Sequence, residues 1–151
     1  GMSADSYIPD YLKEFVRPHF EITSECLFLK DSREVTNKDR QKILDHIRQC
    51  EYDYIVVIHG MFSIEPTSKL VDKYASEFPD KRVIFISSKF PLKNFCPTDA
   101  PFNMGFAVAS IFLSDPGVYV AMNGRLFKAS EVVNRKGRFE ISDMESGFPM
   151  I

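Results

Sequence analysis

Three short apolar runs, set among amphipathic stretches of helical length, constrain the fold of this 151-residue chain most strongly. The runs are YIVVI at 54–58, RVIFISS at 82–88 and GVYVAM at 117–122. Continuous apolar runs are typical of strands covered on both faces, as in parallel sheets. Helical patterns occupy 36–50, 66–78 and 98–114. Together these patterns predict a three-layer α/β/α domain, in which helices cover both faces of a mainly parallel sheet.

The remaining elements follow from local signals. We expect a helix at 7–17, a strand at 20–29 and a hairpin in which Asn123-Gly124 leads to a strand at 125–128. We also expect a loop at 89–97 and a short helical turn at 130–133. Nothing resembling a linker divides the chain, so residues 1–151 are predicted to form a single domain with irregular tails at 1–6 and 141–151.

The charge, hydropathy and cysteine content of the chain indicate which partners and which cellular compartment to expect. The net charge is −2 and the 19 Lys and Arg residues are spread along the chain, which argues against nucleic acid as a partner. No apolar run approaches the ~18 residues that a membrane span needs. The first residues do not resemble a signal peptide. The three cysteines, Cys26, Cys50 and Cys96, form no CxxC pair. We therefore expect free thiols, a cytoplasmic location, and neither metal nor cofactor.

Polar residues follow the first two predicted strands, where sites form in parallel sheets. Asp31 and Ser32 could bind the ammonium or carboxylate of a ligand, or could simply turn the chain before the next helix. His59 could act as a base or be a buried structural residue, and Gly60 allows close backbone approach. Met61, which follows, is apolar where a chemical loop usually carries polar groups.

The third predicted strand ends in Ser87, Ser88 and Lys89, and Lys89 could be a desolvated base, an anion anchor or a solvated loop residue. Asp99 is predicted to cap the following helix. Asn103, inside that helix, is predicted to tie it to a neighbouring loop, because a buried amide needs partners. The chain has no GxSxG, glycine-rich phosphate loop or HExxH motif.

The motifs KDSREVTNKDR, YIVVIHGMFSIEPT, VIFISSKFP, TDAPFNMGFAVA and GVYVAMNGRLF resemble, in order and spacing, the amino-terminal domain of bacterial L-asparaginases. The resemblance runs from about Ile8 to Glu140, and GRFE at 137–140 is similar to short, single-domain members. It implies a Rossmann-like sheet with flavodoxin-like strand order, a homo-oligomer, and amidohydrolase chemistry on a small amide. Ser32 matches a ligand of the substrate carboxylate in this family.

The departures from the family pattern concern catalysis. The family's nucleophilic Thr lies in a TGGTI segment, which this sequence lacks. A Thr and an Asp of the family's HGTDTM motif match Met61 and Phe62, and the partner Lys matches Asn134 by direct count. A slip of one or two residues would place Arg135 or Lys136 there instead. Amide hydrolysis needs a nucleophile beside a base, so we expect a catalytically degenerate protein.

The resemblance also implies an interior strand, the one that ends in TGGTI, between 20–29 and 54–58. Either those two strands pair directly, or a segment from another chain fills the gap, or the natural protein has a segment that this sequence lacks. An unfilled gap is disfavoured because unpaired buried backbone is costly.

Three functions remain open at this stage. A degenerate protein would bind a small amino-acid-like ligand, or a protein partner, near Asp31, Ser32, His59, Gly60, Ser88 and Lys89. An active amidohydrolase would use a rebuilt site around Ser32, His59 and Lys89. A structural role as an oligomeric subunit is the third.

Overall fold

The computed structural model describes residues 7–87, 98–136 and 138–141. A four-stranded sheet lies at the centre, in the order β1-β2-β3-β4. Strands β1 (Tyr54–Ile58), β2 (Arg82–Ile86) and β3 (Gly117–Met122) run parallel, and β4 (Arg125–Lys128) returns antiparallel to β3. The predicted α/β class with a mainly parallel sheet is confirmed.

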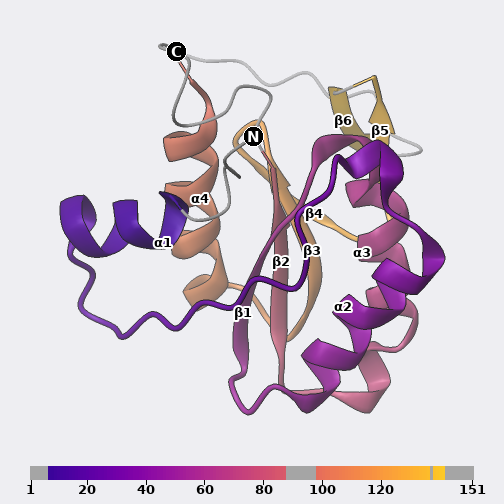
Figure 1. The fold of residues 1–151 in the computed structure, drawn as a ribbon, viewed down its shortest axis with the longest axis horizontal. Coiled ribbons are helices and arrows are strands. Elements are labelled where there is room, and N and C mark those ends of the chain that lie inside the picture. The colour runs from indigo at the N-terminus through magenta and orange to yellow at the C-terminus, as the bar shows by residue number, and fades with distance from the viewer. Residues whose placement is uncertain (1–6, 88–97, 137, 142–151) are drawn as a thin grey trace.

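Helices cover both faces of this sheet (Figure 1). Helices α2 (Asn37–Gln49) and α3 (Ile64–Lys73) lie on one face, whereas α4 (Ala100–Leu113) and α1 (Tyr7–Tyr11) lie on the other. Each face has its own buried cluster. Phe85 and Val83 of β2 face α2 and α3, and Ile84 and Ile86 face α4, because successive side chains of a strand point to opposite faces.

The helix boundaries follow local signals. In α2, the Thr36 hydroxyl accepts a hydrogen bond from the Asp39 amide, and the Asp39 carboxylate accepts one from the Thr36 amide. This capping box holds as predicted, with Asp in place of Glu. Lys30 pairs with Asp39 at 2.8 Å, and these bonds lower the pKa of the Asp39 carboxyl to about 2.

Short helical turns extend or precede several of the predicted helices. A π-helix at Leu12–Val16 continues α1, and 3₁₀ turns lie at Ser32–Glu34, Met61–Ser63 and Ala75–Glu77. Helix α3 starts at Ile64, two residues before the predicted entry at Pro66. The hairpin at Asn123-Gly124 is as predicted, and both residues have positive φ.

The carboxyl-terminal part differs from expectation. The predicted helical turn at 130–133 is a turn at 129–131 followed by strand β5 (Val132–Arg135). Strand β5 pairs antiparallel with β6 (Arg138–Ile141) in a separate two-stranded sheet. The aliphatic side chain of Val132 is fully buried in the core between the main sheet and α3, which favours an extended backbone over a helical one.

The predicted strand at 20–29 is wrong, which removes the first of the three alternatives, the direct pairing of 20–29 with 54–58. Residues 18–30, here called the crossing segment, contain no strand, and none of them makes a backbone–backbone hydrogen bond to another described residue. Ile22 packs on the α4 face of the sheet, whereas Leu27 and Phe28 pack on the α2 face. The segment therefore passes across the free edge of β1 (Figure 1) instead of extending the sheet.

The edge of β1 that faces the crossing segment has no partner strand among the described residues. The Asp53 carbonyl accepts from the Arg82 amide, and the His59 amide donates to the Ile86 carbonyl, so odd-numbered residues face β2. Backbone groups alternate in direction along a strand. Those of Tyr54, Val56 and Ile58 therefore point to the free edge.

Candidate functional site

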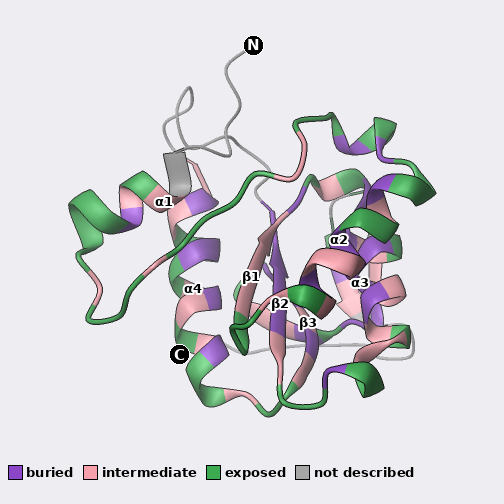
Figure 2. Ribbon diagram, turned by 60° about the horizontal axis from the view of Figure 1, so that its bottom comes forward, coloured by how far each residue is buried: buried purple, intermediate pink, exposed green. Residues whose placement is uncertain are grey.

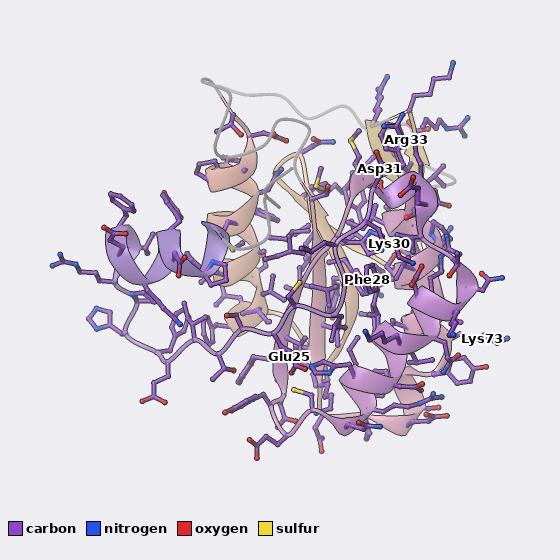
Figure 3. All side chains as sticks on the ribbon, in the orientation of Figure 1. Glu25, Phe28, Lys30, Asp31, Arg33 and Lys73 are labelled. Carbon is purple, nitrogen blue, oxygen red and sulfur yellow. The ribbon has the colours of Figure 1, made fainter. Side chains whose placement is uncertain are left out.

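The carboxyl ends of β1, β2 and β3 meet at one edge of the sheet because the three strands are parallel. Residues 59–63 follow β1 and Ser87 follows β2, while residues 31–34 lie against the loop after β1. This strand-end region is the candidate site. Figure 3 shows Asp31 and Arg33 together at this edge, near the start of α2.

Ser32 is fixed by the loop after β1. Its side chain is buried, and its Oγ accepts a hydrogen bond from the Phe62 amide at 3.1 Å. The Ser63 hydroxyl donates to the Ser32 carbonyl at 2.6 Å. A Cβ atom on Gly60 would lie 2.2 Å from the Cβ of Ser32, so this close approach requires glycine at position 60. Ser32, which was predicted to bind a ligand, therefore uses its hydroxyl and its carbonyl to connect residues 31–34 to the loop after β1.

Asp31 and Arg33 form an exposed ion pair. The Asp31 carboxylate accepts from the Arg33 backbone amide at 2.9 Å and from its guanidinium at 2.8 Å. These bonds lower the pKa of the Asp31 carboxyl to about 2. The Arg33 guanidinium also lies over the ring of Phe62, 4.9 Å from its centroid. A carboxylate, a guanidinium and an exposed aromatic ring thus stand side by side.

His59 is 8% exposed and lies edge-on to Phe85, with 6.2 Å between ring centroids. Its Nδ1 lies 2.8 Å from the Gly60 carbonyl oxygen, so Nδ1 carries the proton in the neutral ring. Burial lowers the pKa of the imidazole and keeps it neutral. Its Nε2 has no hydrogen-bond partner among the described residues. Within the described residues no hydrogen bond joins His59 to Ser32, so these two side chains do not form a nucleophile–base pair.

Asn134 and Met61, two of the positions that the resemblance aligns with the family's proton-handling unit, lie together. The side-chain amide of Asn134 donates to the Met61 carbonyl at 2.8 Å. The Asn134 backbone amide donates to Glu65 at 2.8 Å. Arg135 instead pairs with Glu140, on the opposite side of strand β5 from Asn134. The geometry therefore places Asn134, rather than Arg135, beside Met61.

The loop after β2 is fixed to α4. Asn103 is buried, and its amide donates to the Ser87 carbonyl at 3.0 Å and to the Asp99 carboxylate at 3.1 Å. The predicted tie between Asn103 and a neighbouring loop is thus present. Asp99 occupies the cap position of α4 without a side-chain cap bond, and Thr98 accepts from the Ala100 amide instead. Ser88, Lys89 and Cys96 lie outside the described residues.

Two contributors were missed from the sequence. Arg33 belongs to the ion pair with Asp31, and the D-x-R spacing at the start of a short helical turn is the signal that could have revealed it. Glu65 anchors Asn134, sixty-nine positions away in the chain, and no local pattern announces that contact. Among the described residues, no group of three His, Cys, Asp or Glu side chains could hold a metal ion. No described helix is long and apolar enough to cross a membrane.

A shallow hollow of about 470 Å³ lies away from the strand ends, beside the end of the π-helix. It is lined by Lys13, Arg17, Pro18, Phe20, Glu21, Ile22 and Thr23. The hollow therefore does not coincide with the candidate site.

Comparisons with known proteins place these observations in a family. The model of the asparaginase amino-terminal domain matches residues 2–138. No curated protein sequence matches the chain. The probable cytoplasmic L-asparaginase from Campylobacter jejuni is 21% identical, with a TM-score of 0.75 over 91% of this chain and 43% of that one. The thermostable L-asparaginase from Thermococcus kodakarensis is 20% identical, with a TM-score of 0.76 over 91% and 44%.

Both solved structures share the fold, and the chain spans less than half of their length. The family match covers most of the sequence, including every strand of the main sheet and the strand-end region. This chain belongs to the asparaginase family and corresponds to its amino-terminal domain.

Proposed function

We propose that this chain is a catalytically degenerate asparaginase-like protein that binds a small amino-acid-like ligand at the strand-end region. The observation that carries the proposal is the contact between Asn134 and Met61, which Phe62 follows directly in the chain. A carboxamide, a thioether and a phenyl ring cannot take up and release a proton at neutral pH. In the same order, the family resemblance puts a Lys, a Thr and an Asp at these three positions.

The Asp31–Arg33 pair supports the ligand part of this proposal. The side chains are 44% and 67% exposed, and exposed ion pairs add little to stability, so they can exchange partners at small cost. An α-amino acid carries one ammonium and one carboxylate, which complement Asp31 and Arg33. The Phe62 ring beside them offers an apolar surface for the ligand's side chain.

The activity test measures ammonia released from asparagine and glutamine, with an active L-asparaginase as the positive control. We expect no release above the blank, because removal of a nucleophile–base unit costs several orders of magnitude in rate. Ammonia release that Ser32→Ala abolishes would favour an active amidohydrolase with a rebuilt site and would overturn the proposal.

The ligand test is a thermal shift with aspartate, asparagine, glutamate and other amino acids. At about 100 times its dissociation constant, a ligand stabilises the folded protein by about 2.7 kcal/mol. We expect at least one amino acid to raise the melting temperature, and we expect Asp31→Asn and Arg33→Ala to reduce that rise. Asp10→Asn, an exposed acid on α1, is the matched control and should leave it unchanged. No shift across the panel would contradict ligand binding and favour a structural role.

We further propose that the chain forms a homo-oligomer in the cytoplasm. The family resemblance supports self-association, and one structural relative is a probable cytoplasmic L-asparaginase. A molar mass measured in solution tests the first part.

A further inference from the structure

Helix α4 contains no charged residue from Ala100 to Leu113. A helix on the outside of a globular protein normally carries charged or polar residues on its outer face. Here the outer face carries Phe102, Gly105, Ala109, Phe112 and Leu113, all exposed and here called the α4 stripe. Leu113 is 87% exposed and Phe102 is 61% exposed. Figure 2 shows exposed positions along the outer side of α4.

The α4 stripe continues onto the start of β1. The ring of Phe112 lies 5.2 Å from that of Phe20 and 5.4 Å from that of Tyr54, between centroids. Both of these neighbours are themselves exposed. Single exposed apolar residues are ordinary, but a contiguous apolar surface of this kind marks an interaction site.

We propose that the α4 stripe binds the α4 stripe of a second copy of this chain, in an antiparallel pair around a two-fold axis. This inference rests on the self-association proposed above and assigns it a surface. A two-fold interface must be complementary to itself, since the same patch is used on both subunits. The spacing of the stripe meets that requirement.

Two pairs of positions in the stripe are equally distant from the level of residue 107. Phe102 and Phe112 lie five residues on either side, and Gly105 and Ala109 lie two residues on either side. Antiparallel helices that cross at this level therefore place Phe102 against the partner's Phe112, about 7.5 Å along the axis from the crossing. Gly105 meets the partner's Ala109, so the two smallest side chains lie at the point of closest approach.

The absence of charge in the stripe favours a second copy over a charged partner. Burying an unpaired charge is costly, and the stripe has no group that could neutralise one. Two stripes bury only apolar surface against each other. A Cβ atom on Gly105 would meet nothing within 4 Å, so the crossing point is open in the single chain.

The first test is the molar mass of the protein in solution as a function of concentration. We expect twice the 17.4 kDa of one chain. Ala109→Arg places a charge at the crossing point and should raise the dissociation constant at least about tenfold, equivalent to 1.4 kcal/mol. Gln41→Arg, at an exposed position of α2, adds the same charge and should leave the dimer intact. Circular dichroism should show native helix content in both variants.

The outcomes distinguish two claims: that the chain forms an oligomer, and that the α4 stripe is the surface through which it does so. A wild-type protein of 17.4 kDa at all concentrations would overturn both. An oligomer unaffected by Ala109→Arg would retain self-association and overturn the α4 stripe as its surface.

The second test examines the antiparallel register by disulfide cross-linking, after Cys26, Cys50 and Cys96 are replaced by Ser. A mixture of Gly105→Cys and Ala109→Cys chains, one of them tagged, should form a heterodimeric disulfide several-fold faster than either chain forms a homodimer. Equal rates, or no cross-link in the mixture, would overturn the register.

Discussion

Gly60 shows how one residue can fix two loops of this protein. Its φ of −71° is open to any residue, so the requirement for glycine comes only from contact with Ser32. We expect Gly60→Ala to lower the free energy of unfolding by about 1–3 kcal/mol, measured by urea denaturation, because overpacking forces backbone shifts. In the double variant with Ser32→Gly the clashing atoms are gone. The double variant should therefore lose less unfolding free energy than the two single variants lose in total. Losses that simply add would contradict the proposed clash.

The buried imidazole of His59 predicts a pH dependence of stability. Burial lowers its pKa in the folded state below the value in the unfolded chain, about 6.5. Well above about pH 6.5 the imidazole is neutral in both the folded and the unfolded protein, so its protonation does not affect the free energy of unfolding there. As the pH falls through this value, the unfolded state binds more protons and stability is lost.

We therefore expect the wild type to lose more stability than His59→Gln between about pH 7.5 and about pH 5. Urea denaturation of both proteins at both values measures the difference. The two proteins differ only at position 59, so the difference between their pH dependences reports this side chain. The carboxyls of Asp31 and Asp39, whose pKa values are about 2, titrate in this structure only at much lower pH. Identical pH slopes for the two proteins would show that His59 is protonated to the same degree when folded and unfolded.

Among the elements, β1 is predicted to show alternating protection of its backbone. The amide of Val57 faces β2 and is paired, whereas that of Val56 points to the free edge. We expect the Val56 amide to exchange with solvent deuterium at least about tenfold faster than that of Val57, as read by NMR, since unpaired amides lack protection. Equal protection would mean that another strand pairs with this edge in solution.

The strands of the main sheet could be predicted from the sequence, whereas the path of residues 20–29 could not. The runs at 54–58, 82–86 and 117–122 are recognisable because each is apolar on both faces, which is a local property. The run at 20–29 mixes apolar residues with four polar ones, and a strand also needs a partner for its backbone, which the local sequence does not specify. Ile22 and Leu27 find apolar contacts on opposite faces of the sheet instead, so the segment crosses the edge.

Some residues of the candidate site could also be predicted from local sequence, whereas contacts between residues far apart in the chain could not. Gly60 was predictable as a site residue because it closely follows β1, and Asp31 because it precedes a short helical turn. The contact of Ser32 with Phe62 spans thirty positions in the chain, and no local pattern indicates it. The pairing of Asn134 with Met61 could be expected from the family resemblance alone, because seventy-three positions separate the two residues. The role of Glu65 in holding Asn134 could not, because nothing in the residues around either position signals it.

For the molecule as a whole, Asn134 connects the β5–β6 hairpin to the main domain. Its side-chain amide donates to the Met61 carbonyl and its backbone amide to Glu65, while Val132 and Phe139 of the hairpin are buried in the core. We expect Asn134→Ala to lower the free energy of unfolding by about 1–3 kcal/mol, because the Met61 carbonyl loses its donor. Hydrogen exchange should also accelerate in β5.

Asn37→Ala is the matched control for this prediction. Asn37 is exposed on the first turn of α2 and accepts one hydrogen bond from Arg40. Its removal should change the free energy of unfolding by less than about 0.5 kcal/mol. If both variants lose the same stability, the hairpin is held by its apolar side chains alone.

The crossing segment gives the molecule an unequal resistance to mechanical force. Residues 18–30 are attached through side-chain contacts, so we expect a pull on the amino terminus to break these contacts one after another. The strands behind them share a hydrogen-bonded ladder and must shear together. We therefore expect residues 18–30 to detach at a lower force than the parallel sheet, which bears the load.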